Sequence, residues 1–172
     1  MSDPILRSAT PADAEALFAL IGSQIEEGHL LPRTMSDLRR NASRFVVCEI
    51  DKEIKACGEL TPLSPAVAEF RSLVVARDFR RVGLAARLVT DLTRRARTAG
   101  FDSVSVFTHD PRFFVGQNFS IVPHLWVPEK IRNTCFTCPL FGRCAQFAMV
   151  KSVDPVGRYD TAAAVMGQAG AA

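Results

Sequence analysis

An arginine-rich turn with one glycine separates an apolar segment from an amphipathic segment near the middle of the chain. The segment before the turn, residues 67–75, is rich in valine, which predicts a buried strand. After the turn, apolar residues recur at the spacing of one helix face: Leu84, Leu88, Val89, Leu92 and Ala96. The turn, residues 79–83, therefore opens a helix that follows directly on a strand.

Such a turn is suited to binding phosphate. The first amides of a helix have no intrahelical acceptor and lie at the positive end of the helix dipole. Gly83 lets the backbone approach an anion closely, and Arg80 and Arg81 add positive charge. We predict that the turn binds the phosphates of a nucleotide. The alternative is a plain strand-to-helix turn in which the glycine serves only the chain reversal.

The pattern Arg80-x-x-Gly83-x-Ala85 resembles the acetyl-coenzyme A signature of the GNAT N-acetyltransferase superfamily, Gln/Arg-x-x-Gly-x-Gly/Ala. The resemblance implies acetyl-CoA as co-substrate. In that family the strand before the turn splays away from the next strand, and its exposed backbone pairs with the pantetheine arm. The residues implied to bind the cofactor are Leu73, Val74, Val75, Arg80, Arg81, Val82, Gly83, Leu84, Ala85 and Ala86.

Hydrophobic patterns elsewhere predict strands at residues 5–7, 45–50, 54–60 and 103–108, and strands at 119–126 and 146–153 that close the sheet. Helices are predicted to begin at Pro11 and to cover residues 35–42 and 111–116. This order resembles the GNAT fold over residues 4–152. It implies an α/β fold with one mixed, mostly antiparallel sheet of six to seven strands, flanked by about four helices and splayed between strands four and five.

Length and composition bound the organisation of the chain. With 172 residues, 48% of them hydrophobic, we expect one domain over residues 1–152 and a disordered tail at 153–172 that has too little apolar pattern to pack. No apolar run reaches membrane-spanning length and no signal pattern opens the chain, so we expect a cytoplasmic protein without a membrane partner. The sequence leaves open whether it forms a homodimer.

The net charge of +3 is modest, but arginines gather near the turn and its helix. We attribute this to an anionic cofactor and expect no nucleic-acid partner. A nucleic-acid site is the competing interpretation. A solvated basic helix face accounts for Arg94, Arg95 and Arg97, which lie beyond the first turn.

A narrower resemblance rests on several separated motifs. They match the acetyltransferase domain of the N-acetylglutamate synthases and are Leu30-Leu31-Pro32-Arg33, residues 68–75, Phe113-Phe114, residues 127–131, Cys135-x-x-Cys138-Pro139 and Cys144. The resemblance implies transfer of acetyl to the α-amino group of L-glutamate or a similar acidic amino acid, in arginine biosynthesis. Asn118, Thr134 and Gln146 depart from that pattern and leave the acceptor open.

The same resemblance implies a catalytic base. Glu69 belongs to an Ala-Glu-x-Arg-Ser motif, and strand alternation places it on one face with Arg71 and Leu73. The alternatives are a structural pair of Glu69 with Arg71 and a solvated glutamate at the strand edge. Many GNAT enzymes use a tyrosine as acid, but Phe113 and Phe114 stand in that region. The leaving thiolate then takes its proton from water or from an unassigned group.

An acidic acceptor needs cations that grip its carboxylates, and the candidates are Arg33, Arg71 and Lys130. The alternatives are a surface residue beside a proline for Arg33 and a strand-edge ion pair for Arg71.

Two further functions of the protein stay open. One is acetylation of another amine, such as a protein N-terminus, a lysine or a polyamine. The other is non-catalytic binding of acyl-CoA, which the absence of the tyrosine would fit.

Three cysteines, Cys135, Cys138 and Cys144, lie within ten positions. A tetrahedral zinc site needs four ligands, so these thiols fall one short, although His124 would complete the set. We expect packing thiols and no metal. A disulfide is disfavoured in a cytoplasmic chain.

Overall fold

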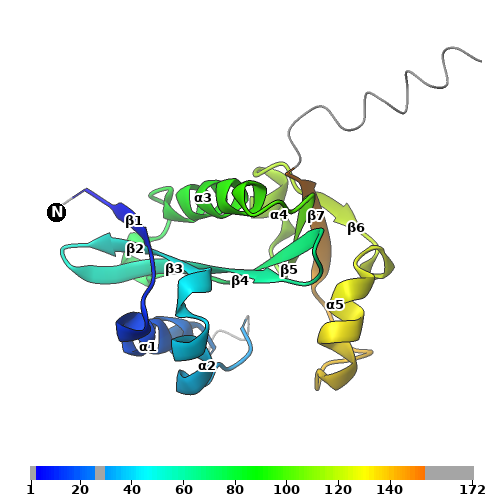
Figure 1. Cartoon of the computed structure of the whole chain (residues 1–172), viewed down its shortest axis with the longest axis horizontal. Helices are drawn as coiled ribbons and strands as arrows, with labels where there is room; N and C mark the ends of the chain where they lie inside the picture. The colour runs from blue at the N-terminus through cyan, green and yellow to red at the C-terminus, as the bar shows by residue number, and fades with distance from the viewer. Residues whose placement is uncertain (1–2, 26–29, 154–172) are drawn as a thin grey trace, which may run out of the picture.

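The computed structural model describes residues 3–25 and 30–153 and shows an α/β fold (Figure 1). Its strands are β1 Ile5–Ser8, β2 Phe45–Ile50, β3 Glu53–Pro62, β4 Val67–Val75, β5 Ser103–Thr108, β6 Ser120–Val122 and β7 Phe147–Ser152. Its α-helices are α1 Ala14–Ile25, α2 Met35–Arg40, α3 Leu84–Thr98, α4 Pro111–Val115 and α5 Pro128–Asn133. Short 3₁₀ turns lie at Pro11–Asp13, Ala42–Arg44, Arg77–Phe79, His124–Trp126 and Cys135–Thr137. The predicted tail from residue 154 onward lies outside the described residues.

All seven strands form one sheet in the order β1-β2-β3-β4-β5-β7-β6, in which only the β4–β5 pair is parallel. This confirms the predicted mixed, mostly antiparallel sheet. The described residues add one helix to the four expected. The segment predicted as a strand over residues 119–126 forms only the short β6, because Pro123 lacks a backbone N–H for the ladder. After a 3₁₀ turn the chain enters α5, which the sequence analysis missed.

Helices cover both faces of the sheet (Figure 1). On one face, α3 buries Leu88 and Leu92 against strand residues that include Phe70 and Val104. On the other face, α1 and α2 pack over a second cluster that includes Leu17, Phe45 and Cys57. In Figure 1, α5 lies below the sheet on the same side as α1 and α2. None of the helices in the described ranges is both long and apolar enough to cross a membrane.

The parallel pairing of β4 with β5 is short. Val67–Phe70 pair with Ser103–Val106, and the pairing ends there. Beyond that point β4 continues to Val75 beside β3, while β5 continues to Thr108 beside β7. The two strands therefore separate after Phe70 and Val106, which confirms the predicted splay. This separation leaves the edge of β4 that faces β5 without a neighbouring strand in the described part of the chain.

A β-bulge lies where β4 leaves β5. Arg71 pairs with Glu59 and Val74 with Cys57, so Ser72 and Leu73 together oppose Gly58. Ser72 has φ of 47°, in the left-handed region. The bulge changes which side chains face α3: Leu73 packs in the α3 cluster, whereas Arg71 faces the α2 side. Simple alternation placed Leu73 on the face of Glu69 and Arg71, and that prediction is wrong because alternation fails at a bulge.

Gly58 makes this packing possible. A Cβ at position 58 would lie 2.9 Å from Leu92 Cδ1 and 3.1 Å from Leu73 Cδ1. Alanine at position 58 is therefore expected to lower the free energy of unfolding by about 1–3 kcal/mol through overpacking.

Gly22 in α1 is the control for this prediction, since a Cβ there meets nothing within 4 Å. Gly22→Ala is expected to raise stability by about 0.5–1 kcal/mol because alanine favours the helix. Urea denaturation of both variants measures the difference. Equal stability of the two variants would contradict tight packing above Gly58.

Candidate active site

The predicted phosphate turn joins the free end of β4 to α3. After the 3₁₀ turn at Arg77–Phe79, the chain from Arg80 to Gly83 is exposed, and Arg81 and Gly83 have φ of 65° and 86°. Gly83 stands at the N-cap of α3, and no side chain of the described residues caps this helix. Arg87 N–H donates to Gly83 O at 3.1 Å, so the three amides before it lack helical acceptors.

The structure places the other predicted cofactor residues beside this turn. Leu73, Val74 and Val75 lie on the part of β4 that has left β5. Ala76 N–H donates to Lys55 O at 2.8 Å, and hydrogen-bond directions alternate along an antiparallel ladder. The Val75 N–H therefore points away from β3, toward the splay. The free edge of β4 and the N-terminus of α3 therefore belong to one continuous stretch of chain.

Arg80 differs from its neighbours in this turn because its side chain bonds the end of β4 and α1. Its Nε donates to Val75 O at 3.3 Å, and its guanidinium also donates to Gln24 Oε1 of α1. The side chain therefore runs back along β4 and ties the strand end to α1. Arg81 and Val82 are exposed beside Gly83.

The second group of predicted residues meets around Glu69. This carboxylate is 3% exposed, and its Oε1 accepts a hydrogen bond from Lys130 Nζ of α5 at 2.7 Å. Arg71 Nε lies 3.9 Å from Oε2. Lys130 also lies over the ring of Phe107, 5.2 Å from its centroid. The structure thus brings the predicted base together with two of the three predicted acceptor-binding residues.

Arg33, the third of these, has its guanidinium occupied. Its Nε donates to Asp37 Oδ2 at 2.8 Å, and its Nη1 donates to Glu59 Oε2 at 2.7 Å and to Ser72 Oγ at 3.0 Å. Burial lowers the pKa of Arg33, but its hydrogen bonds to both carboxylates and their negative charge outweigh this and hold the pKa above its ordinary value. Arg33 therefore lies directly against the bulge and joins it to α2.

Sequence reasoning missed Glu59 and Asp37, the partners of Arg33. Glu59 is 1% exposed, although it sits within a strand whose neighbours are mostly apolar. A glutamate in such a segment was the available signal, because a buried carboxylate needs a counter-charge. The sequence alone does not reveal which cation supplies it.

The three cysteines lie after α5 in and beyond the 3₁₀ turn Cys135–Thr137. Cys135 and Cys138 are partly exposed, Cys144 is exposed, and all three are free thiols. Burial raises the pKa of Cys135. Within residues 3–25 and 30–153, no three His, Cys, Asp or Glu side chains are placed to hold a metal ion. His124 contacts the ring of Phe107 instead, with 5.6 Å between centroids.

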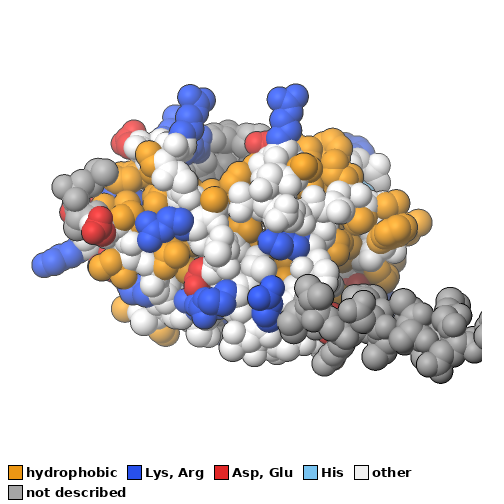
Figure 2. Space-filling view, turned by 90° about the horizontal axis from the view of Figure 1, so that it is seen from above, with side chains coloured by type: hydrophobic (Ala, Val, Ile, Leu, Met, Phe, Trp, Pro, Cys, Tyr) orange, Lys and Arg blue, Asp and Glu red, His pale blue; other side chains and the backbone are white. Residues whose placement is uncertain are grey.

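Basic side chains of α3 pair locally. Arg94 and Arg95 lie 2.5 and 2.6 Å from Asp91, and Arg97 Nε donates to Val153 O at 2.9 Å. Figure 2 shows this side of the molecule, where lysine and arginine side chains stand apart among apolar and uncharged groups. Arg94 is exposed, as expected for a solvated basic face, whereas Arg95 is partly buried and also donates to Ser8 Oγ at 2.6 Å.

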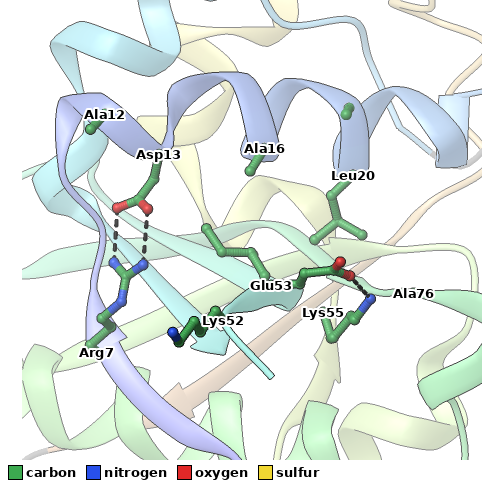
Figure 3. A pocket seen from close by; sticks show the side chains of 11 residues that line it. Arg7, Ala12, Asp13, Ala16, Leu20, Lys52, Glu53, Lys55 and Ala76 are labelled. Carbon is green, nitrogen blue, oxygen red and sulfur yellow. Dashed lines mark hydrogen bonds and ion pairs between the residues drawn. The ribbon is translucent and has the colours of Figure 1, made fainter. Parts of the chain in front are cut away.

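A groove of about 450 Å³ lies between α1 and β3 and holds none of the predicted site residues (Figure 3). Two ion pairs line it: Arg7 donates to both oxygens of Asp13 at 2.8 and 2.9 Å, and Lys55 pairs with Glu53. The hydrogen bond from Arg7 lowers the pKa of Asp13 to about 2. This pairing fixes the N-terminal strand β1 to the 3₁₀ turn that precedes α1.

Comparison with known proteins identifies the family to which the chain belongs. Residues 13–114 match the acetyltransferase (GNAT) family, and the chain belongs to this family, whose co-substrate is acetyl-CoA. An uncharacterized N-acetyltransferase of Chlorobaculum tepidum is 28% identical over 152 residues, which are 88% of this chain and 98% of the relative. The predicted fold, family and co-substrate are confirmed.

Similarity to amino-acid acetyltransferases covers part of each protein. The enzyme of Azotobacter vinelandii is 35% identical over 104 residues, 60% of this chain, and the match spans about a quarter of that relative, 24%. The solved N-acetylglutamate synthase from Neisseria gonorrhoeae, complexed with coenzyme A and N-acetyl-glutamate, has a TM-score of 0.79 at 21% identity. That likeness covers 90% of this chain and 36% of the synthase, and it shows the fold.

The Arg33 network gives a stability prediction. Arg33→Met removes the counter-charge of buried Glu59 and is expected to cost about 3–5 kcal/mol of the free energy of unfolding. Arg39→Met is the matched control, since Arg39 and its partner Glu15 are 57% and 78% exposed, and it is expected to change stability by less than about 0.5 kcal/mol.

Urea denaturation compares the two variants. Adding Glu59→Gln to Arg33→Met is expected to recover part of the loss, because the unpaired charge is then removed. Equal unfolding midpoints for Arg33→Met and Arg39→Met would contradict a buried ion pair.

Proposed function

We propose that the protein transfers the acetyl group of acetyl-CoA to the α-amino group of L-glutamate or a similar acidic amino acid, in arginine biosynthesis. The observation that carries this proposal is the meeting of Glu69, Arg71 and Lys130 beside the splay. A buried carboxylate can take the amine proton there, and a nearby arginine can hold an acceptor carboxylate. The partial similarity to amino-acid acetyltransferases supports the same acceptor class.

In this proposal the cofactor occupies the stretch from β4 to α3. The pantetheine arm runs along Leu73, Val74 and Val75 and bonds the backbone that faces the splay. The diphosphate accepts hydrogen bonds from the amides that open α3, after Gly83. Arg81 and Val82 border it as exposed neighbours. Arg80 contributes by fixing the end of β4 through Val75 and Gln24.

The chemistry then needs three events. Glu69 Oε2 takes a proton from the acceptor ammonium, and the electron pair left on nitrogen attacks the thioester carbonyl carbon. A backbone N–H near the bulge, that of Leu73, stabilises the oxyanion. The Val74 N–H points toward β3, because hydrogen-bond directions alternate along the ladder. The carbon–sulfur bond breaks, the nitrogen loses its second proton to water, and the thiolate gains a proton. The described residues offer no tyrosine for this step, and Phe114 is buried, so the thiolate takes its proton from water.

Arg71 is the residue we propose for the acceptor carboxylate. Its side chain is 33% exposed, and the 3.9 Å approach to Glu69 is the closest ion-pair contact that the described residues give it. Its planar fork thus keeps donors for a ligand. Lys130, bonded to Oε1, acts by orienting Glu69. Arg33, which the sequence also suggested for the acceptor, acts by holding Ser72 and the bulge.

The cofactor turn is tested with two glycines of equal conformation. Gly83 and Gly100 flank α3, each with φ of 86° and with nothing within 4 Å of an added Cβ. Alanine at either site is expected to cost about 1 kcal/mol of stability through backbone strain.

Calorimetry separates the two glycine variants. Gly83→Ala is expected to weaken coenzyme A binding about tenfold, because the turn shifts away from the diphosphate, whereas Gly100→Ala should bind as the parent does. Equal affinities for both variants would remove the turn from the cofactor site.

The acceptor is tested by following free coenzyme A thiol with a panel of amines. We expect turnover with L-glutamate, and we expect Arg71→Met to raise KM for glutamate about 10- to 100-fold while changing KM for acetyl-CoA less than about twofold. Arg44→Met, at an exposed arginine, is the control.

Other outcomes of the panel point to the alternatives. Turnover restricted to lysine peptides or polyamines would favour another amine. Binding of acetyl-CoA without turnover of any amine would favour the non-catalytic function.

A further inference from the structure

Thr61 of β3 lies beside Glu69 of β4 in the sheet. The two residues are direct partners in the antiparallel register of β3 and β4, so their side chains lie on the same face with about 5 Å between Cβ atoms. Both are more than nine-tenths buried, with 7% of Thr61 and 3% of Glu69 exposed. Thr61 therefore borders the carboxylate that we propose as the base.

Each of these residues has a polar atom that no other described residue satisfies. Thr61 Oγ1 and Glu69 Oε2 are buried without a hydrogen-bond partner among the described residues. Their neighbours are satisfied: Lys130 holds Glu69 Oε1, and Ser105, the register partner of Glu69 on β5, donates to Ala68 O at 3.2 Å. Arg71 Nε, 3.9 Å from Glu69 Oε2, is beyond hydrogen-bond distance. Buried polar atoms are nearly always bonded, so these two atoms, which belong to partner residues on one face of the sheet, point to a bound polar group.

The hydrogen-bonding capacity of the two atoms limits which chemical groups can bond both. A carboxylate oxygen only accepts hydrogen bonds, and a threonine hydroxyl can accept one as well. A group with two donor hydrogens on one atom, such as an amino group or a water molecule, can therefore bond both atoms when the hydroxyl accepts. A third unsatisfied atom, His124 Nε2, lies beside Phe107 on another element and is not part of this pair.

We propose that Thr61 is a catalytic residue that holds the acceptor amino group against Glu69. Thr61 Oγ1 accepts one N–H of the ammonium, and Glu69 Oε2 accepts a second N–H and takes it as a proton. The nitrogen keeps the electron pair, which then forms the bond to the thioester carbon. This inference rests on the proposed acetyl transfer and adds the group that orients the nitrogen before attack.

The test compares Thr61→Val, which keeps the shape and removes the hydroxyl, with Thr61→Ser, which keeps the hydroxyl. Thr61→Val is expected to lower kcat with glutamate about 10- to 100-fold, with coenzyme A affinity unchanged by calorimetry. Thr61→Ser should restore most of kcat. Thr93→Val is the control, a buried threonine whose hydroxyl bonds Val89 O inside α3. It is expected to leave kcat unchanged.

A double variant separates catalysis from structure. If Thr61 and Glu69 act on the same nitrogen, Thr61→Val should lower kcat little further in a Glu69→Gln background. Wild-type kcat in Thr61→Val, equal losses in Thr61→Ser, or fully multiplied losses in the double variant would each overturn the proposal. If the parent protein turns over no amine, the acetyl-transfer function fails and Thr61 loses its role with it. If the parent turns over and Thr61→Val matches it, only this inference fails.

Discussion

Pairing between β4 and β5 ends after four residues, and the arrangement of the site depends on where it ends. Glu69 is the third of the paired β4 residues, so neighbours on both sides, Thr61 and Ser105, hold it in the sheet. From Arg71 onward, two residues after Glu69, the edge of β4 that faces β5 is free. A rigid carboxylate thus stands directly before a backbone edge that can receive an extended ligand. Each further pair of ladder residues would shorten that free edge.

The bulge at Ser72 is held from both faces. On one side Leu73 packs beside Leu92 of α3 over Gly58, and on the other Arg33 connects Ser72 to Glu59 and to α2. A left-handed serine is a costly conformation that persists only when its surroundings determine it. Here apolar packing and a buried ion pair do so together, which makes the direction of the neighbouring amides a fixed property of the fold.

Sequence patterns predicted most of the elements, the splay and the glycine turn at the start of α3, because each depends on neighbours along the chain or on a family motif. The partners of the charged residues could not be predicted in this way. Arg33 reaches Glu59 across 26 positions and Lys130 reaches Glu69 across 61, and such contacts leave no local periodicity. The bulge was missed for a similar reason, since it exists only in the register between β3 and β4. It is also why Leu73 was placed on the wrong face.

The proposed cofactor stretch and the proposed acceptor site draw on different parts of the chain. The first is continuous from β4 into α3, whereas the second combines Glu69 and Arg71 of β4 with Lys130 of α5, an element that follows the match to the common family region, residues 13–114. Under this proposal, mutation in the late segment can alter which amine is accepted while thioester binding is preserved. A chain built in this way can diverge into enzymes of different acceptor preference through changes confined to its last third.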